Sequence, residues 1–275
     1  MNTLILGGNG FIGRNIAKGL QNVGHDVQVI DHPEIDLSMK LSDFTDWCKV
    51  NNLKKCDTLI NCVGVNGAQK SYSQLRHFLQ LNGFSAMNVV QLIKKLGCAT
   101  FVHISSETVL GSGDNIDEKS HMAPAHPYAF SKGIFEAYMM TDPVFEEINS
   151  IALRLPIITG EDNSIDSAFD FIKQDFASGG PVVLYGNGSH KRKFMSVNDV
   201  AKVVEICSHT AQRGFQILHA PGVILSMNEI YEQLCRTQGV RPQKIYKEPK
   251  AQSQVATLVS QTSEVFRDLT LSNIF

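Results

Sequence analysis

Apolar and polar positions follow two alternating patterns along the first 160 residues. Short apolar runs occur at Leu4–Leu6, Thr58–Val63, Phe101–Ile104 and Ile151–Leu155, and such runs are typical of strands buried on both faces. Longer stretches with apolar residues at helical spacing separate them. Strands that alternate with helices predict a parallel sheet covered on both faces. We therefore expect an α/β fold with a Rossmann-type doubly wound parallel sheet.

The alternation weakens after Pro156. We expect a first domain of residues 1–160 and a smaller C-terminal lobe of residues 161–275 that is interleaved with it. The polar segment 111–127 is predicted to be a mobile loop, and the tail is expected to hold one short helix within 255–271. The predicted helices are Phe11–Leu20, Phe44–Val50, Leu75–Leu96, Tyr128–Met140, Phe169–Ala177, Asp199–Cys207 and Met227–Cys235.

A cluster of glycines follows the first apolar run. Gly7, Gly8, Gly10 and Gly13 satisfy both G-x-G-x-x-G and G-x-x-G-x-x-G. Glycines permit a tight turn and a close backbone approach to a pyrophosphate, and the N-terminus of the next helix favours an anion. This strand–turn–helix context predicts a bound dinucleotide, with a plain glycine turn in another kind of α/β protein as the alternative.

An acidic residue, Asp31, closes the second predicted strand, which contains Val27, Val29 and Ile30. An acid about 20 residues after the glycines can accept hydrogen bonds from the adenosine ribose hydroxyls. Because a carboxylate repels a 2′-phosphate, we expect NAD as the cofactor. NADP stays possible, since nearby Arg14 could partner a phosphate.

Tyr128 and Lys132 form a Y-x-x-x-K pair on a predicted helix. Positions i and i+4 share one helix face, so the Lys132 ammonium should lie near the phenol and lower the pKa of Tyr128 from about 10 toward neutral pH. Such a tyrosine can exchange a proton with a substrate hydroxyl while a hydride moves to or from nicotinamide. A solvated helix face is the alternative, but the pair follows a dinucleotide pattern and a strand ending in Ser105–Ser106.

The composition excludes several classes of function. The 275 residues are 43% hydrophobic and 19% charged with a net charge of −2, so no basic footprint for nucleic acid is present. No apolar run approaches the roughly 20 residues of a membrane span, and the apolar N-terminus is expected to be a core strand, not a signal peptide. Six scattered cysteines without a C-x-x-C pair predict reduced thiols in a cytoplasmic protein and no metal site.

Several segments together resemble the extended short-chain dehydrogenase/reductases, the NAD-dependent epimerase/dehydratase group that acts on nucleotide sugars. Gly7–Gly13 resembles the cofactor turn of this family, and Ile35–Leu37 resembles its adenine-contacting segment. HISSETVLG (103–111) and PYAFSKGIFE (127–136) resemble its catalytic segments. YGNGSHKRKFMSVNDVA (185–201) is similar to the segment whose arginine binds the nucleotide pyrophosphate.

The resemblance implies roles for individual residues and an oligomeric state. Ser106, Tyr128 and Lys132 would be catalytic, Glu107 and Arg192 would bind a nucleotide-sugar substrate, and residues 161–275 would form the substrate-binding lobe. The family commonly forms homodimers, here through helices within 75–96 and 128–141. The implied cofactor-binding residues are Gly7, Gly10, Phe11, Ile12, Gly13, Asp31, Asp36, Leu37, Val63, Tyr128 and Lys132.

Some positions depart from the family pattern. Lys193 stands where aspartate is usual, and Thr108 stands where dehydratases carry their second acid. The lack of an acid at position 108 argues against a dehydratase. Glu107 could still act as an acid, and the alternative is that Glu107 is a loop carboxylate in water. Arg192, likewise, is either a phosphate ligand or part of a solvated basic turn.

The resemblance implies an NAD-dependent epimerase. Tyr128 would take a proton from a sugar hydroxyl as NAD takes the hydride, Ser106 would hydrogen-bond the same oxygen, and Lys132 would hold the nicotinamide ribose. The keto sugar would rotate and receive the hydride on its other face. A nucleotide-sugar reductase or dehydratase of the same family is the alternative, and a non-catalytic dinucleotide-sensing regulator is a third hypothesis.

Overall fold

A six-stranded parallel sheet forms the centre of the computed structural model, which describes residues 1–161, 167–210, 212–249 and 256–275. The strand order is β10-β6-β4-β3-β1-β2, and all neighbours are parallel. The predicted α/β doubly wound sheet is therefore confirmed. The strands are β1 (Asn2–Leu6), β2 (Asp26–Ile30), β3 (Thr58–Asn61), β4 (Thr100–Ser106), β6 (Asn149–Leu155) and β10 (Gly214–His219).

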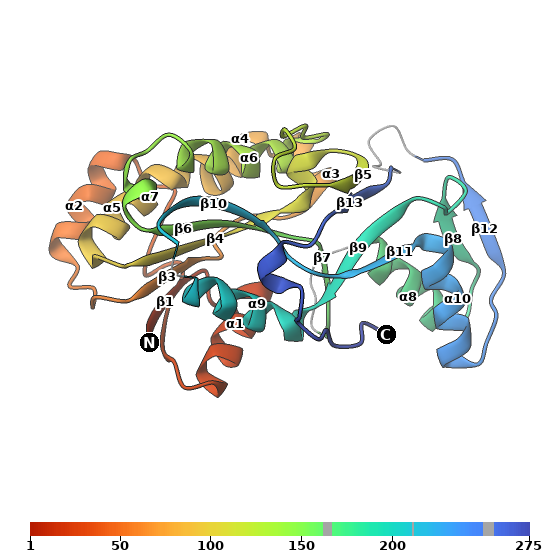
Figure 1. Cartoon of the computed structure of the whole chain (residues 1–275). Coiled ribbons are helices and arrows are strands. Elements are labelled where there is room, and N and C mark those ends of the chain that lie inside the picture. The colour runs from red at the N-terminus through yellow and green to blue at the C-terminus, as the bar shows by residue number, and fades with distance from the viewer. Residues whose placement is uncertain (162–166, 211, 250–255) are drawn as a thin grey trace.

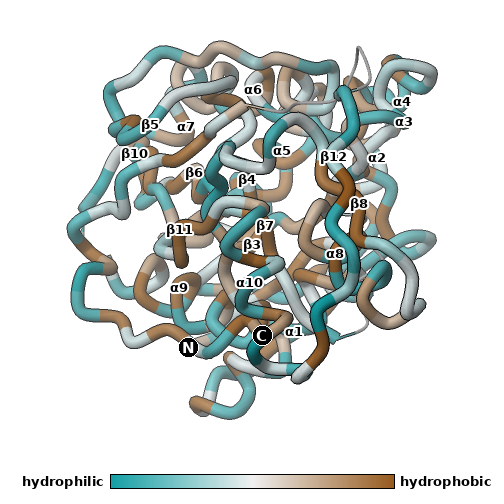
Figure 2. The backbone as a smooth tube through the Cα atoms, turned by 90° about the vertical axis from the view of Figure 1, so that its right-hand side faces the viewer, coloured by the Kyte–Doolittle hydropathy of each residue, from teal (hydrophilic) through white to brown (hydrophobic). Residues whose placement is uncertain are grey.

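Helices cover both faces of this sheet (Figure 1). On one face, α1 and α9 pack closely because Gly19 has no side chain; a Cβ there would lie 2.2 Å from the Cβ of Ala201. Each face holds its own cluster of buried apolar side chains, and Figure 2 shows hydrophobic backbone segments, such as β3, inside the molecule. The covering helices are α1 (Phe11–Asn22) and α9 (Val197–His209) on one face, and α2 (Leu41–Val50), α5 (Ser85–Leu96), α6 (Pro127–Met139) and α7 (Val144–Glu147) on the other.

The stretch predicted as one helix over residues 75–96 is interrupted. It consists of α4 (Leu75–Phe78), a π-helical turn η1 (Leu79–Phe84) and α5, and it follows the short α3 (Ala68–Ser73). A π-turn shifts the side chains around the helix axis and is frequent at functional sites. Gly97 ends α5 in the left-handed conformation with φ +62°, as its position in the sequence predicts.

A second lobe lies at the right of Figure 1 and has its own apolar core. It packs α8 (Ala168–Ser178) and α10 (Met227–Gln238) with the parallel pair β8 (Val182–Tyr185) and β12 (Lys244–Lys247). A five-stranded sheet joins this lobe to the first domain. It contains β11 (Val223–Ser226), β9 (Lys191–Ser196), β13 (Leu258–Ser260), β5 (Gly113–Ile116) and β7 (Ile157–Thr159).

Residues after 160 contribute to both parts of the molecule, since α9 and β10 return to the first sheet. The segment 111–127, expected to be a loop, contains β5. The tail holds the expected short helix, the 3-10 turn η3 (Glu264–Phe266), but also β12 and β13. The tail strands were not predicted, because they are short and rely on partners elsewhere in the chain.

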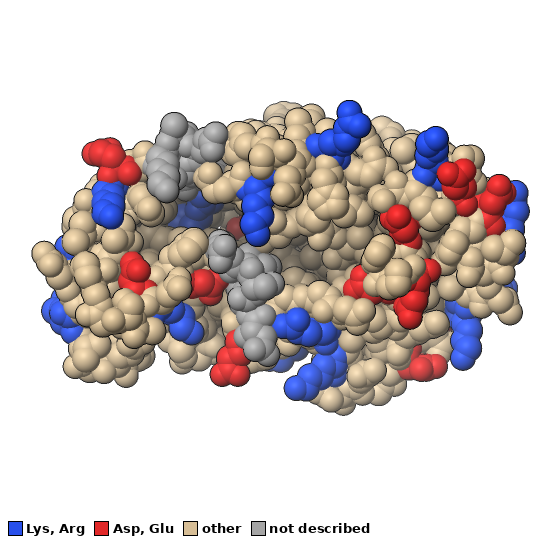
Figure 3. All heavy atoms as spheres, turned by 180° about the vertical axis from the view of Figure 1, so that it is seen from behind, with Lys and Arg blue, Asp and Glu red and all other residues tan. Residues whose placement is uncertain are grey.

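Acidic and basic side chains are interspersed over the face in Figure 3. All six cysteines are free thiols, five of them buried. Within the part of the chain that the structure describes, no helix has the length and apolarity to cross a membrane, and no group of three His, Cys, Asp or Glu side chains is placed to hold a metal ion.

Candidate active site

The glycine turn between β1 and α1 has no room for side chains at Gly7, Gly8 and Gly13. Gly7 has φ +73°, and a Cβ there would lie 2.9 Å from the Val63 nitrogen. A Cβ on Gly13 would lie 2.3 Å from the Gly7 carbonyl oxygen. The tight turn places the N-terminus of α1, a helix of 12 residues, at the carboxyl end of the sheet. Unpaired N–H groups and the helix dipole favour an anion there.

Asp31 holds the glycine turn against the end of β2. One carboxylate oxygen accepts a hydrogen bond from the Asn9 amide at 2.9 Å, and the other accepts one from the His32 amide at 2.8 Å. Each oxygen retains acceptor capacity for a ribose hydroxyl. The charge of this carboxylate opposes a 2′-phosphate at the same place.

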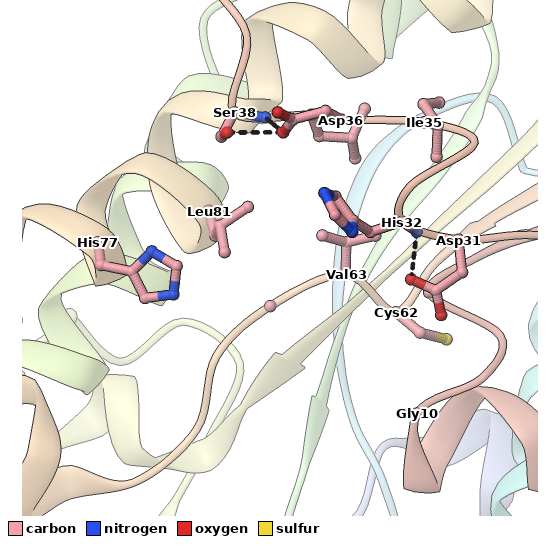
Figure 4. Close-up of a pocket in the computed structure, with 13 residues that line it drawn as sticks. Gly10, Asp31, His32, Ile35, Asp36, Ser38, Cys62, Val63, His77 and Leu81 are labelled. Carbon is pink, nitrogen blue, oxygen red and sulfur yellow. Dashed lines mark hydrogen bonds between the residues drawn. The ribbon is translucent and has the colours of Figure 1, made fainter.

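A cavity of about 410 Å³ lies in front of this turn (Figure 4). Asp31 and His32 border it on one side, and His77 and Leu81 face them from α4 and η1. Its volume and polar rim fit the adenosine end of a dinucleotide. The cavity is lined by Gly7, Gly10, Asp31, His32, Ile35, Asp36, Leu37, Ser38, Cys62, Val63, Gly64, His77 and Leu81.

Six of the predicted cofactor residues line this cavity: Gly7, Gly10, Asp31, Asp36, Leu37 and Val63. Phe11, Ile12 and Gly13 do not; they lie in the first turn of α1. His32, Cys62 and His77 also line the cavity, but the sequence analysis did not predict them as cofactor residues. His32 directly follows Asp31 and could have been suspected, whereas His77 lies on a helix with no local signal for a cofactor.

The predicted catalytic side chains converge at the end of β4. The hydroxyl of Ser106, the last residue of that strand, hydrogen-bonds the half-buried Tyr128 phenol. Tyr128 lies in the first turn of α6, which begins at Pro127; the Nδ1 atom of His126 caps this helix by accepting from the Ala129 amide at 3.1 Å. The cap fixes the start of the helix and therefore the direction of the phenol.

The expected lowering of the Tyr128 pKa is not seen. Burial raises the pKa of Tyr128, and the hydrogen bond from Ser106 only opposes that rise. The Lys132 ammonium instead donates to the Ile104 carbonyl at 2.9 Å, and burial lowers the pKa of Lys132 to about 8. The helical spacing placed both residues correctly on one face, but desolvation, which the sequence does not reveal, dominates the titration of each.

Asn82 and Gly64 shape the space around Lys132. The Asn82 carboxamide accepts from the Val65 amide at 2.8 Å and donates to the Val65 carbonyl and to the Ser131 hydroxyl. A Cβ on Gly64 would lie 2.7 Å from the Asn82 side-chain oxygen and 3.1 Å from the Lys132 nitrogen. The π-turn η1 thus joins the segment after β3 to α6, and glycine leaves room for the lysine.

A buried ion pair connects α6, the helix of Tyr128 and Lys132, to strand β6. Glu136, one turn after Lys132, lies 2.7 Å from Arg154 on β6, and the two side chains are 0% and 1% exposed. The Ser105 hydroxyl also donates to Glu136. These contacts tie β4, α6 and β6 together directly behind Ser106 and Tyr128.

Glu107 and Arg192 are both buried, so two of the alternatives considered for them are wrong. Glu107 is 4% exposed and lies 2.7 Å from the Lys193 nitrogen, hence it is not a loop carboxylate in water. Burial raises the pKa of Glu107, and Lys193 opposes that rise. Arg192 is buried on strand β9, not in a solvated turn; burial lowers its pKa to about 10 while Glu107 counteracts the shift.

Comparison with known proteins adds a family match and a common fold. A model of the NAD dependent epimerase/dehydratase family matches residues 3–216. The chain is 22% identical to a putative UDP-glucose 4-epimerase of Methanocaldococcus jannaschii, over 90% of this chain and 86% of the relative. It is 27% identical to the ADP-L-glycero-D-manno-heptose-6-epimerase of Brachyspira hyodysenteriae, over 73% of this chain and 70% of the relative.

Two solved structures have the same fold. MoeE5 in complex with UDP-glucose and NAD superposes with a TM-score of 0.82 at 23% identity, covering 99% of this chain and 93% of that one. A UDP-N-acetylglucosamine 4-epimerase from Methanobrevibacter ruminantium M1, in complex with UDP-N-acetylmuramic acid, gives 0.82 at 19% identity, covering 98% and 93%.

Proposed function

The chain belongs to the NAD-dependent epimerase/dehydratase family, and on that premise we propose that it is a nucleotide-sugar epimerase. NAD is its cofactor, and the reaction is a reversible hydride transfer at a hydroxyl-bearing carbon of the sugar. The observation that carries the proposal is the convergence of Ser106, at the end of β4, with Tyr128 and Lys132, which lie one turn apart on α6. Side chains of these three types, placed in this way, are suited to exchanging a proton with a substrate oxygen.

The glycine turn and Asp31 provide the cofactor end of the site. The α1 N-terminus would face the pyrophosphate, and Asp31 would accept the ribose hydroxyls. The two backbone amides bound to Asp31 keep its carboxylate in place before any cofactor arrives. These features favour NAD over NADP.

The catalytic side chains would handle one proton. NAD held by the glycine turn, Asp31 and Lys132 would supply the acceptor and then the donor of the hydride. Tyr128 accepts the proton of the sugar hydroxyl and gives it back to the keto oxygen, while Ser106 hydrogen-bonds that oxygen. Lys132, whose ammonium donates to the Ile104 carbonyl one helical turn from Tyr128, would hold the nicotinamide ribose.

The surroundings of Glu107 favour an epimerase over a dehydratase. An acid that eliminates water must reach the substrate, but Glu107 is held by Lys193 and by the Ser260 hydroxyl. Thr108, at the position of the second dehydratase acid, hydrogen-bonds the Ser106 hydroxyl at 2.9 Å. A hydroxyl there has no charge with which to remove a proton from carbon.

A nucleotide sugar is the substrate class that the relatives support. Several similar proteins are named for UDP- or ADP-linked sugars. Arg192, on the strand that joins the two lobes, would bind the diphosphate through its planar guanidinium.

The substitution Tyr128→Phe tests the proposed chemistry. It should lower kcat by at least about 100-fold, because the proton loses its acceptor, while the Kd for NAD stays within twofold of wild type. Tyr72→Phe, at an exposed tyrosine of α3, is the matched control and should leave kcat unchanged. Turnover by Tyr128→Phe close to that of wild type would refute the assignment.

We also propose a homodimer through the outer faces of α5 and α6. Met87 on α5, Phe130 on α6 and Phe84 at the end of η1 are large, exposed apolar side chains. The turn η1 packs closely on α6, where a Cβ on Gly83 would lie 3.0 Å from Ile134. Light scattering should give twice the chain mass for wild type and the mass of one chain for Phe130→Glu. A monomeric wild-type protein at micromolar concentration would contradict the dimer.

A further inference from the structure

A buried ion pair joins the turn after Ser106 to strand β9. The three donors of the Lys193 ammonium are directed at the Glu107 carboxylate at 2.7 Å, the Ser260 hydroxyl at 2.8 Å and the Ala220 carbonyl at 2.8 Å. The Ser260 hydroxyl donates in turn to Glu107. Buried charges persist when they are paired and hydrogen-bonded, and this pair meets both conditions.

The pair holds together three segments that are far apart in the sequence. Glu107 opens the 3-10 turn η2 (Glu107–Leu110), Lys193 lies on β9, and Ser260 ends β13. Leu258 of β13 packs against the apolar residues of η2 and lies in register with Arg192 of β9. The turn η2 is therefore fixed by polar contacts to β9 and β13 and by an apolar contact to β13.

The position of η2 determines that of the Ser106 hydroxyl. This hydroxyl accepts a hydrogen bond from the Thr108 amide at 3.3 Å and lies 2.9 Å from the Thr108 hydroxyl, both within η2. It also hydrogen-bonds the Tyr128 phenol. Any shift of η2 would move Ser106 relative to Tyr128.

We propose that Glu107 and Lys193 are positioning residues, whose ion pair fixes η2 and so holds the Ser106 hydroxyl on the Tyr128 phenol. The same pair couples this placement to the strand that carries Arg192. The inference rests on the proposed function for the roles of Ser106, Tyr128 and Arg192. The Ala220 carbonyl needs a hydrogen-bond donor at position 193. The cation of the pair therefore lies at position 193 and the carboxylate at position 107.

The variants Glu107→Gln, Lys193→Met and the double substitution test this role. Each single change should lower kcat by roughly tenfold, the effect of losing one charge-assisted hydrogen bond, and leave the Kd for NAD unchanged. The pKa of Tyr128 should rise, because the Ser106 hydrogen bond lowers it in the intact protein. The double variant should be no slower than the slower single one, since both remove the same pair.

Asp199→Asn is the matched control for a lost buried carboxylate. Asp199 lies on α9, where it accepts hydrogen bonds from Lys202 and Ser272. The substitution Asp199→Asn should lower the stability of the protein without changing the pH profile of kcat. If Glu107→Gln behaves like this control, the positioning role is refuted. If the charged-pair variants do not fold, Ser260→Ala decides: it should shift the pH profile in the same direction, and an unshifted profile would overturn the proposal.

The titration of Tyr128 separates this inference from the proposed function. The phenolate absorbance of wild type minus that of Tyr128→Phe gives the pKa of Tyr128 without any substrate. Absence of turnover on every nucleotide sugar would overturn the proposed function alone. An unchanged Tyr128 titration in Glu107→Gln would overturn the positioning role, whatever the substrate.

Discussion

The substitution Glu136→Gln should destabilise the fold strongly, because it leaves a buried charge without its partner. Arg154 is 1% exposed. It donates from Nη2 to Glu136 at 2.7 Å and from Nε to both carboxylate oxygens at 3.2 Å. Breaking a buried ion pair by removing one partner costs about 3–5 kcal/mol. Glutamine keeps one acceptor oxygen, so we expect about 3 kcal/mol, a large share of the usual 5–15 kcal/mol of a folded protein.

Urea unfolding followed by circular dichroism measures this cost. With a slope of about 3 kcal/mol per molar for a chain of this size, the midpoint should fall by about 1 M at an unchanged slope. Asp46→Asn is the control, because the Lys49–Asp46 pair is 69% and 75% exposed and such surface pairs contribute about 0–1 kcal/mol.

The double variant Glu136→Gln/Arg154→Met separates the cost of the orphaned charge from that of altered packing. Removing both charges should restore at least half of the lost stability, because a neutral pair leaves no charge unpaired. A midpoint for Glu136→Gln within error of that for Asp46→Asn would refute the reasoning. So would a double variant less stable than Glu136→Gln.

Two further predictions follow from the geometry. In Gly64→Ala the new Cβ meets the Asn82 oxygen and the Lys132 nitrogen, so kcat should fall at least about tenfold; Gly180→Ala, whose Cβ has space, should not change kcat, and equal rates in the two variants would contradict the account. Burial lowers the pKa of His219 to about 4 from an ordinary 6.5, so the unfolded chain binds more protons between these values and stability should fall as the pH drops from 6.5 to 4. Urea midpoints of His219→Gln should depend less on pH in this window, and wild-type and variant curves that run parallel would count against the assignment.

Local patterns in the sequence predicted the elements that carry several of the candidate site residues. The glycine turn, Asp31 and the Y-x-x-x-K pair are set by neighbours within one or two elements, so spacing alone places them on the correct strand, turn or helix. The same holds for the parallel sheet, whose apolar runs reflect burial on both faces.

Such local patterns could not predict contacts between segments that are distant in the sequence. Glu107 lies in a polar motif and Lys193 in a basic run, and only the pairing of η2, β9 and β13 shows that they neutralise each other. The raised pKa of Tyr128 likewise follows from burial by the complete fold. The π-turn η1 was hidden because its residues continue the apolar spacing of a regular helix.

Product analysis by chromatography and mass spectrometry tests the central claim most directly. The purified protein is incubated with UDP-, dTDP- and ADP-linked sugars in the presence of NAD and, in parallel, of NADPH. An epimerase converts one of them to a product of unchanged mass and altered retention, without net formation of NADH. A product that has gained two hydrogens with consumption of reduced cofactor, or lost one water, would contradict the proposed reaction.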